Sequence, residues 1–204
     1  MIPAPEAFAR LREGNRRFVQ SLADDEAAPG LRKISLTLEQ NPSAIILGCS
    51  DARVPAEIVF DQGPGELFVI RVAGNIVSPS QVGSVEFAAE RFGTRLVVVL
   101  GHSRCGAIQA TIEDLTQPGS AHSRNLRSIV DRIRPSVAPL LQTGLANDLD
   151  RLARLAVRAN VAVSVNHLRH GSEILERLIR TDGLVVVGAE YAIETGVVEF
   201  FDEP

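Results

Sequence analysis

The sequence predicts an α/β fold: a single domain, residues 1–204, with a mostly parallel central sheet flanked by helices. Short apolar runs rich in Val, Ile and Leu alternate with longer amphipathic stretches, as in parallel strands joined by helices. Turn residues, mostly Gly and Pro, separate the two kinds of segment. With 45% hydrophobic residues among 204, the chain has enough apolar surface for one substantial core.

The first predicted helix covers residues 5–21 and begins an N-terminal helical arm. Apolar side chains recur among charged ones at helical spacing, at Phe8, Leu11, Phe18 and Val19. A loop over residues 22–33 and a short helix over 31–40 complete the arm. Because the first helix has little local sheet to cover, we expect residues 1–40 to pack on a partner subunit.

Five segments are predicted to be strands. Four of them are short, apolar throughout and rich in β-branched residues, as strands buried in a parallel sheet are. They cover residues 44–48, 67–72, 95–100 and 184–188. The fifth follows a turn at the C-terminal end of the chain and covers residues 196–201. The predicted sheet therefore has four parallel strands plus a C-terminal edge strand.

Helices are predicted between the first strands. A short one begins near Pro55, and a longer one runs from Pro79 to Phe92, where Gly93 is suited to the C-cap. A third covers residues 106–115.

The segment between the third and fourth strands is longer and mostly helical. After a loop at residues 118–123, we expect helix to about Arg180. Pro lacks the amide that a helix interior uses, and Gly favours helix ends. We therefore expect breaks near Pro135, Gly144 and His170-Gly171.

The composition argues against several classes of partner. The net charge is −4, so no basic field attracts nucleic acid or anionic membrane, and no apolar stretch is long enough to span a bilayer. The first residues lack the basic and apolar regions of a secretory signal. Two cysteines without such a signal do not suggest a disulfide framework. We expect a cytoplasmic protein with free thiols and no nucleic-acid or membrane partner.

The two cysteines and one histidine follow the ends of two predicted strands. Cys49 comes directly after residues 44–48, and His102 and Cys105 follow residues 95–100. Sites in open α/β sheets are built at this carboxyl edge. Two Cys and one His offer three ligands for Zn²⁺ and leave a fourth position open, as in catalytic zinc sites. One zinc per chain would lower the pKa of a bound water toward roughly 7.

A carboxylate and a guanidinium lie beside this motif. Asp51 comes two residues after Cys49 and two before Arg53. A neighbouring Arg keeps a carboxylate ionised and fixes its direction. Asp51 could accept the proton of a zinc-bound hydroxide, or it could occupy the fourth metal position and close the site. The sequence leaves both roles open.

Plainer interpretations exist for each residue. Two free cysteines can be buried core residues without a metal. Asp51 and Arg53 can form an ordinary ion pair, and His102 can donate to a backbone carbonyl. The combination of these residues at two strand ends is hard to explain by packing. A non-catalytic protein that uses the thiols to store metal or sense redox state remains the second functional class to consider. Zinc nucleobase deaminases are set aside because the chain has no Cys-x-x-Cys.

Two motifs resemble those of the β-class carbonic anhydrases. They are Cys-Ser-Asp-Ala-Arg at residues 49–53 and His-Ser-Arg-Cys-Gly at residues 102–106, and further similarity covers residues 65–71, 73–77, 83–87 and 188–191. The resemblance implies a carbonic anhydrase (carbonate dehydratase, a lyase) that hydrates CO2 reversibly to bicarbonate and a proton. Zinc-bound hydroxide, oriented by an Asp-Arg dyad, would attack CO2. The resemblance also implies a homodimer or homotetramer.

The resemblance assigns a role to each matching position. Cys49, His102 and Cys105 resemble the zinc ligands, and Asp51 and Arg53 resemble the dyad. The matching substrate-binding positions are Gln40, the main-chain amide of Gly106, and the apolar pocket residues Phe68 and Phe87, partly supplied by the neighbouring subunit. Phe87 departs from the family, where a Tyr is common at this position.

Two positions favour the plant-like subgroup, whose zinc keeps water as its fourth ligand. Gln40 lies where those members have a substrate-binding glutamine. A different subgroup binds bicarbonate at a regulatory site made by a Trp, an Arg and a Tyr. Here Ile46 stands at the Trp position, although Arg71 and Tyr191 match the other two. We expect that regulatory site to be incomplete.

The resemblance does not fix the substrate. Carbonyl sulfide and carbon disulfide hydrolases are related to these enzymes and share the metal ligands. They would keep the metal and change the pocket around it. Hydrolysis of one of these gases therefore stays an alternative to CO2 hydration.

Overall fold

The computed structural model describes residues 2–24, 40–117 and 123–203. Within them lies one sheet, built from β1 (Ala44–Gly48), β2 (Leu67–Arg71), β3 (Leu96–His102), β4 (Val185–Tyr191) and β5 (Val198–Phe200). The strand order is β2-β1-β3-β4-β5. The first four strands are parallel and β5 runs antiparallel to β4. The predicted α/β class, with four parallel strands and a C-terminal edge strand, is confirmed.

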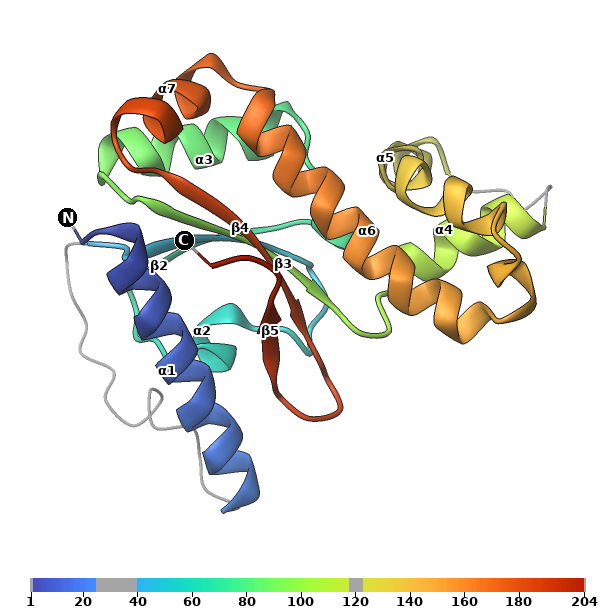
Figure 1. The fold of residues 1–204 in the computed structure, drawn as a ribbon, viewed down its shortest axis with the longest axis horizontal. Helices are drawn as coiled ribbons and strands as arrows, with labels where there is room; N and C mark the ends of the chain where they lie inside the picture. Colours follow the sequence, from blue (N-terminus) through green and yellow to red (C-terminus); the bar gives the residue numbers. More distant parts are fainter. Residues whose placement is uncertain (1, 25–39, 118–122, 204) are drawn as a thin grey trace.

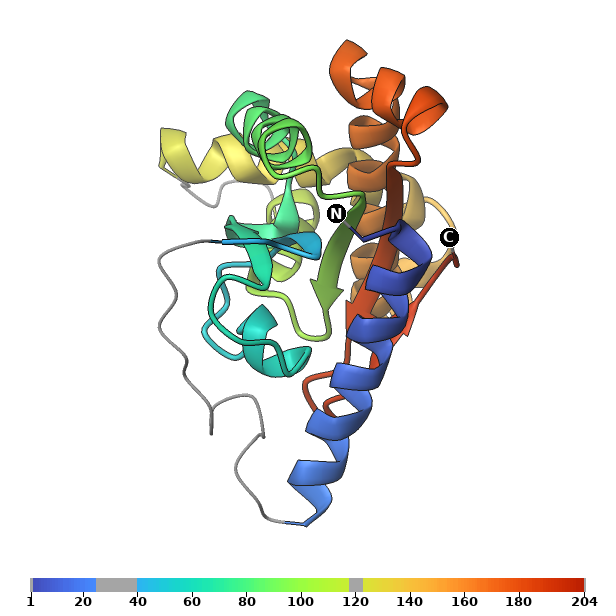
Figure 2. The same ribbon diagram turned by 90° about the vertical axis from the view of Figure 1, so that its left-hand side faces the viewer.

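Helices cover both faces of the sheet, as Figures 1 and 2 show. One face carries α1 (Ala4–Ala23) and α2 (Ala56–Val59). The other carries α3 (Pro79–Arg91), α7 (Glu173–Thr181) and the C-terminal half of α6 (Leu149–His170). The sheet is therefore the middle layer of three.

Strand β1 shows why its sequence is apolar throughout. All five of its residues are buried. Ala44 and Ile46 belong to the core on the α1 side, whereas Ile45 and Leu47 belong to the core on the α3 and α6 side. Successive side chains of a strand point to opposite faces, so a central strand that is covered on both sides has no polar face.

The first helix lies on its own chain. Phe8, Leu11 and Phe18 of α1 are buried in the same core as Ile46 and Val98 of the sheet. Our expectation of an arm on a partner assumed that α1 has little sheet of its own to cover, and that reason is wrong. The short helix α2 leaves most of this face open, and α1 fills it. Contacts of residues 1–40 with a partner stay a prediction.

Two close contacts fix where α1 lies. The buried Asn15 donates through Nδ2 to the carbonyls of Val59 (3.0 Å) and Gly196 (2.8 Å), and its Oδ1 accepts from the amide of Val198 (2.9 Å). At Gly14 the helix meets α2 so closely that a Cβ would lie 1.8 Å from the carbonyl oxygen of Phe60. The helix is thus tied both to α2 and to the turn before β5.

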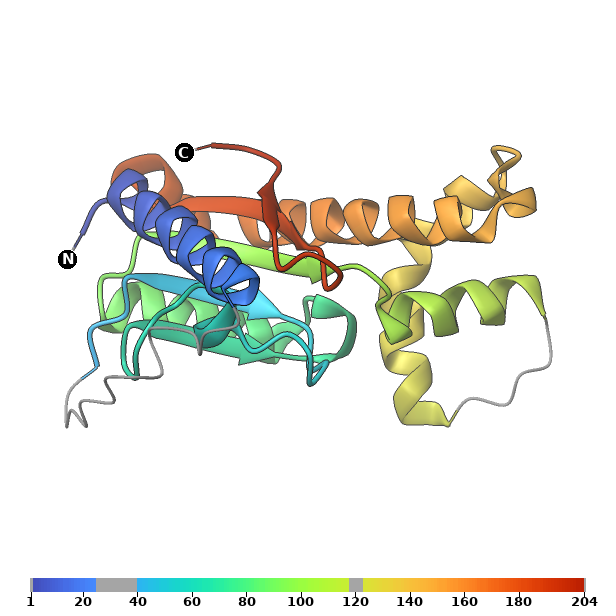
Figure 3. The ribbon, with the colours of Figure 1, turned by 90° about the horizontal axis from the view of Figure 1, so that it is seen from below.

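A second, smaller core extends beyond the carboxyl ends of the strands (Figures 1 and 3). It is built from α4 (Gly106–Thr116), α5 (Arg124–Leu141) and the N-terminal half of α6. Its buried residues include Ile108, Ile133 and Leu152, and Cys49 and Cys105 belong to the same cluster. This lobe therefore covers the sheet edge at which the predicted metal ligands lie.

Some predicted boundaries differ from the structure. Strand β3 continues to His102 and β4 to Tyr191, because these two residues pair with each other at the end of the β3–β4 ladder. The predicted break at Pro135 is wrong, because α5 continues through it. Packing of Ile133 and Val137 against the second core outweighs the lost helical hydrogen bond.

Other expectations about the helical region are confirmed, or concern residues that the structure does not describe. The chain leaves the helical conformation at Gly144, whose φ is +64°, and α6 ends at His170. The predicted loop at 118–123 and the predicted short helix over 31–40 lie almost entirely outside the described residues. No described helix has the length and apolar character needed to cross a membrane.

Candidate metal centre and active site

The structure brings the three predicted metal ligands together. Cys49 follows β1, His102 ends β3, and Cys105 is the N-cap residue of α4. Because β1 and β3 are adjacent and parallel, their carboxyl ends meet at one place. All three side chains are buried, and one ligand atom from each lies within 4.8 Å of the others. At this spacing a single metal ion could be coordinated by all three side chains.

The tautomer of His102 suits a metal ligand. Its Nδ1 lies 2.8 Å from the carbonyl oxygen of Ser103, so Nδ1 carries the proton and donates it. That leaves a lone pair on Nε2. This atom is buried and has no hydrogen-bond partner among the described residues. A buried acceptor without a partner is costly, and Zn²⁺ between Nε2 and the two sulfurs would remove that cost.

The two cysteine sulfurs shift each other's pKa in opposite directions. Interaction with the Cys105 sulfur, despite the opposing effect of burial, places the pKa of Cys49 far below that of a free thiol. The same interaction raises the pKa of Cys105. Burial alone would lower the pKa of His102, but the Cys49 thiolate outweighs it and raises that pKa. A metal must displace these protons, so metal affinity should rise with pH.

The predicted dyad of Asp51 and Arg53 is formed in the structure. Arg53 donates from Nε to Oδ1 (2.9 Å), from Nη2 to Oδ2 (2.8 Å) and from its backbone amide to Oδ1 (3.0 Å). These hydrogen bonds hold the pKa of Asp51 well below its usual range. Asp51 Oδ2 lies 4.0 Å from His102 Nε2. An ionised carboxylate therefore lies beside the ligand cluster and is oriented by a bidentate partner.

Two residues to which the sequence analysis gave no part in the candidate metal centre support it. Arg71 donates to the carbonyls of Cys49 (3.0 Å) and Asp51 (2.6 Å). Glu194 accepts from the hydroxyl of Ser103 (2.7 Å) and pairs with Arg104 Nε (2.8 Å). These contacts cross between segments far apart in the sequence. Spacing along the chain could not have revealed them.

The turn between His102 and Cys105 is strained. Arg104 has a φ of +54°, in the left-handed region that residues with a side chain seldom adopt. In this conformation its carbonyl accepts a hydrogen bond from Arg53 Nη2 (3.3 Å). The Glu194 contacts to both residues before Cys105 help to hold this turn. The strain thus lies where a predicted metal ligand and the Asp51–Arg53 pair meet.

Gly106, the predicted source of a substrate-binding amide, lies beside the cluster. It is the first residue of α4, and a Cβ there would meet no atom within 4 Å. A cleft opens at Cys105 and Gly106, between α4, α6 and the turn before β5, and is also lined by Gln109, Arg154 and Glu194. The start of α4 is therefore accessible from outside the core.

The structure does not bring the other predicted substrate residues to the cluster of the same chain. Phe68 pairs with Ile45, four residues before Cys49, which is about 13 Å along the strand. The ring of Phe87 lies 6.2 Å from that of Phe68, and Phe87 is 54% exposed. Gln40 is exposed and precedes β1 at its opposite end. Within one chain these residues cannot contact a ligand at Cys49.

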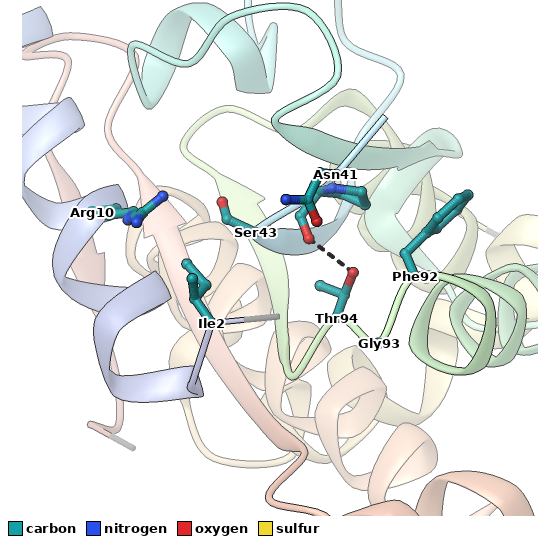
Figure 4. Close-up of a pocket in the computed structure, with 8 residues that line it drawn as sticks. Ile2, Arg10, Asn41, Ser43, Phe92, Gly93 and Thr94 are labelled. Carbon is teal, nitrogen blue, oxygen red and sulfur yellow. Dashed lines mark hydrogen bonds between the residues drawn. The ribbon is translucent and has the colours of Figure 1, made fainter. Parts of the chain in front are cut away.

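A separate pocket lies at the amino end of β1, near Gln40 (Figure 4). It is lined by Ile2, Arg10, Asn41, Pro42, Ser43, Phe92, Gly93 and Thr94. Thr94 Oγ1 donates to the carbonyl of Pro42 across it (2.9 Å). Its lining has neither a carboxylate nor a Cys or His, and the length of β1 separates it from Cys49. We assign no chemistry to it.

Comparisons with known proteins agree with this site. Residues 44–198 match the family model described as carbonic anhydrase. Carbonic anhydrase 2 of Mycobacterium tuberculosis is 37% identical over 193 residues, 93% of this chain and 89% of that protein. A β-carbonic anhydrase of Coccomyxa, solved with acetazolamide, gives a TM-score of 0.67 at 26% identity, covering 93% of this chain and 83% of that one. A tetrameric β-carbonic anhydrase of Sordaria macrospora gives 0.71 at 22%, covering 96% and 97%.

The chain therefore belongs to the β class of the carbonic anhydrase family. It is an enzyme of that family, a lyase. The family match spans the two motifs that carry the Cys-His-Cys cluster and the Asp51–Arg53 pair.

The Asp51–Arg53 pair should make folding stability depend on pH in one direction. The pKa of Asp51 is below its ordinary 3.8 in the folded protein, so the unfolded chain takes up the proton first as the pH falls. The contribution of the Asp51–Arg53 pair to folding stability is complete well above pH 3.8 and is lost as the pH falls below it. Urea unfolding of the metal-free wild type and Asp51→Asn should differ by about 1 kcal/mol or less near pH 6, because Arg53 is half exposed. A difference that grows as the pH falls toward about 4 would contradict this assignment.

Proposed function

We propose that this chain is a zinc-dependent enzyme that hydrates CO2 reversibly to bicarbonate and a proton. The observation that carries the proposal is Nε2 of His102, which is buried without a hydrogen-bond partner among the described residues and lies near the two cysteine sulfurs and the Asp51 carboxylate. Cys49, His102 and Cys105 would hold one Zn²⁺ per chain. A zinc ion so held acts as a Lewis acid and makes water a nucleophile near neutral pH.

The residues around the metal would orient the reactants. Asp51, kept ionised by Arg53, would accept a hydrogen bond from the attacking oxygen and so direct its lone pair toward carbon. The amide of Gly106, at the N-terminus of α4, would donate to an oxygen of the product anion. Arg71 would keep the Asp51 loop in place through its two carbonyl contacts.

We further propose that the fourth metal position is open to water. Both carboxylate oxygens of Asp51 already accept from Arg53, which holds the carboxylate beside the cluster and away from the metal position. Ile46, at the position of the regulatory Trp, is fully buried in the core under α1. Arg71 is already engaged by two backbone carbonyls. These contacts support the open, plant-like form over the self-closing one.

A second copy of the chain would complete the pocket. Gln40, Phe68 and Phe87 lie away from the cluster of their own chain, so they could bind substrate only at the site of a partner. Phe68, Phe87 and Phe92 form a ring cluster at the sheet edge formed by β2, with centroids 5.7 to 6.2 Å apart. The structural relative from Sordaria is tetrameric. We therefore propose a homodimer or homotetramer.

Replacing Phe87 with Asp should dissociate the oligomer. The side chain is 54% exposed, so its loss costs a single chain little, whereas a charge in a subunit interface is unfavourable. Light scattering should report the mass of one chain, and CO2 hydration should fall with it. Leu149→Asp, at a side chain 52% exposed in the second core's lobe, is the matched control and should leave the mass unchanged. An unchanged mass in Phe87→Asp would refute this interface.

We propose a cytoplasmic location. Cys49 and Cys105 are both free in the structure although they lie close together. A reducing compartment keeps such thiols available as metal ligands. Fractionation of the producing cells, with markers for each compartment, would test this.

Metal removal and restoration test the proposed function. The purified enzyme should contain about one zinc per chain, lose CO2 hydration on chelation and regain it when zinc is returned. If the purified protein has full zinc and does not hydrate CO2, but hydrolyses carbonyl sulfide or carbon disulfide, it belongs functionally with the related hydrolases. Full zinc with neither activity would favour the non-catalytic metal protein.

A further inference from the structure

We propose that Asn160 and Ser164 of α6 are positioning residues for the metal ligand Cys49 and that they increase the affinity of the site for zinc. They would act through the Ala73–Asn75 turn, which follows β2 and contacts the Cys49 sulfur. The inference rests on the proposed zinc function. It adds two residues that lie outside both sequence motifs and do not themselves reach the metal.

The turn has a strained backbone. Gly74 has a φ of +71° and Asn75 a φ of +43°, so two consecutive residues are left-handed. Asn75 has a side chain, and such a residue is strained in this region. At Gly74 a Cβ would lie 2.7 Å from Ile133 Cδ1 and 3.0 Å from Ala107 Cβ. The surrounding structure must hold this conformation.

Helix α6 supplies two hydrogen bonds that hold the turn. Asn160 Nδ2 donates to the carbonyl of Gly74 (2.8 Å), and Ser164 Oγ donates to the carbonyl of Asn75 (3.0 Å). The donors are four residues apart and therefore lie on one face of the helix. They are only 2% and 3% exposed, between the apolar residues that pack on the sheet. Buried donors of this kind are expensive unless they are used.

The Ala73–Asn75 turn also contacts the proposed metal ligand Cys49. The amide of Gly74 donates to Cys49 Sγ at 3.3 Å. The direction of that amide depends on the φ and ψ angles of the turn, which Asn160 and Ser164 fix from the other side. A hydrogen bond to the charged sulfur stabilises the thiolate and orients it. The path runs from α6 through the turn to the ligand.

Partners that contact a metal ligand directly set the scale for the expected effect. Replacing partners that orient metal ligands typically costs about 10- to 100-fold in metal affinity. Asn160→Leu keeps a similar volume but leaves the Gly74 carbonyl without its donor, so we expect a loss in that range. Ser164→Ala removes the second donor and should cost about 10-fold.

The test measures zinc affinity by competition with a colorimetric chelator, in the full chain. The wild type and the two variants are compared with Val165→Ala, which truncates another buried α6 residue, one that packs on the sheet at Gly188. Thermal melting of the metal-free proteins reports the structural cost of each change. Val165→Ala should lower the melting temperature and leave zinc affinity unchanged, whereas Asn160→Leu and Ser164→Ala should weaken zinc binding.

A spectroscopic signature separates positioning from general destabilisation. In the cobalt-substituted proteins, loss of a hydrogen bond to the thiolate should move the sulfur-to-cobalt charge-transfer band to lower energy in the Asn160 and Ser164 variants only. Zinc affinity within twofold of the wild type, with an unmoved band, would overturn the inference. Equal weakening in Val165→Ala would also overturn it. A wild type that binds zinc no better than Cys49→Ala would instead overturn the proposed zinc site, and the inference with it.

Discussion

Asp51→Ala is expected to lower the turnover number for CO2 hydration by about 10²- to 10⁴-fold, the usual contribution of a positioned acid or base. The carboxylate lies 4.0 Å from His102 Nε2 and both its oxygens are oriented by Arg53. None of the three proposed ligands is removed, so zinc content should stay near one per chain. The loss should therefore fall on turnover and not on metal binding.

Stopped-flow hydration and metal analysis on the same sample would measure this. Asp131→Ala is a suitable control, because Asp131 lies on the outer side of α5 and its side chain is 54% exposed. Its activity should match the wild type. Equal activity in Asp51→Ala at full zinc would remove Asp51 from the mechanism. A parallel loss of zinc and activity would instead make it a metal ligand.

Gly14→Ala is expected to destabilise the protein by about 1–3 kcal/mol, although Ala is the better helix former. In an unconstrained helix the change would stabilise by about 1 kcal/mol. Here the new methyl group would lie 1.8 Å from the carbonyl oxygen of Phe60, so α1 must move away from α2. Forcing atoms into a packed contact costs about 1–3 kcal/mol or more, and α1 also buries Leu11 and Phe18 in the core.

Urea unfolding at several protein concentrations would test this effect. Glu13→Ala, one residue earlier on the exposed side of α1, should change stability by no more than about 0.5 kcal/mol. If α1 packs on its own chain, the loss in Gly14→Ala is independent of concentration. A stabilised Gly14→Ala protein would show that α1 does not contact α2. A loss that shrinks with concentration would place α1 on a partner instead.

The sheet could be predicted from the sequence because its central strands are buried on both faces. A run such as Ala44–Gly48 has no polar position, and this pattern is a local property of the chain. The position of α1 was not predictable in this way. Its apolar stripe shows that the helix is buried, but the free sheet face that receives it exists only once β1, β3 and β4 have assembled.

The site shows the same division between local and assembled features. The ligands and the dyad could be proposed because Cys49 and His102 lie at the ends of two strands, and because Asp51 is two residues from both Cys49 and Arg53. The supports could not, because Glu194, Asn160 and Ser164 reach the site only through tertiary contacts. Gln40 matches a family residue and Phe87 stands at a family substrate position with a different residue type. Their distance from the cluster of their own chain could not be predicted, because it depends on how the subunits assemble.

The most direct test of the account is the rate of CO2 hydration against pH, by stopped flow, on protein with measured zinc. We predict fast turnover at about one zinc per chain, rising with pH through a single transition near neutral pH, as an open zinc site requires. Full zinc with activity only at high pH would contradict the open site and make Asp51 the fourth ligand at rest. Full zinc with no CO2 hydration at any pH would contradict the proposed function itself.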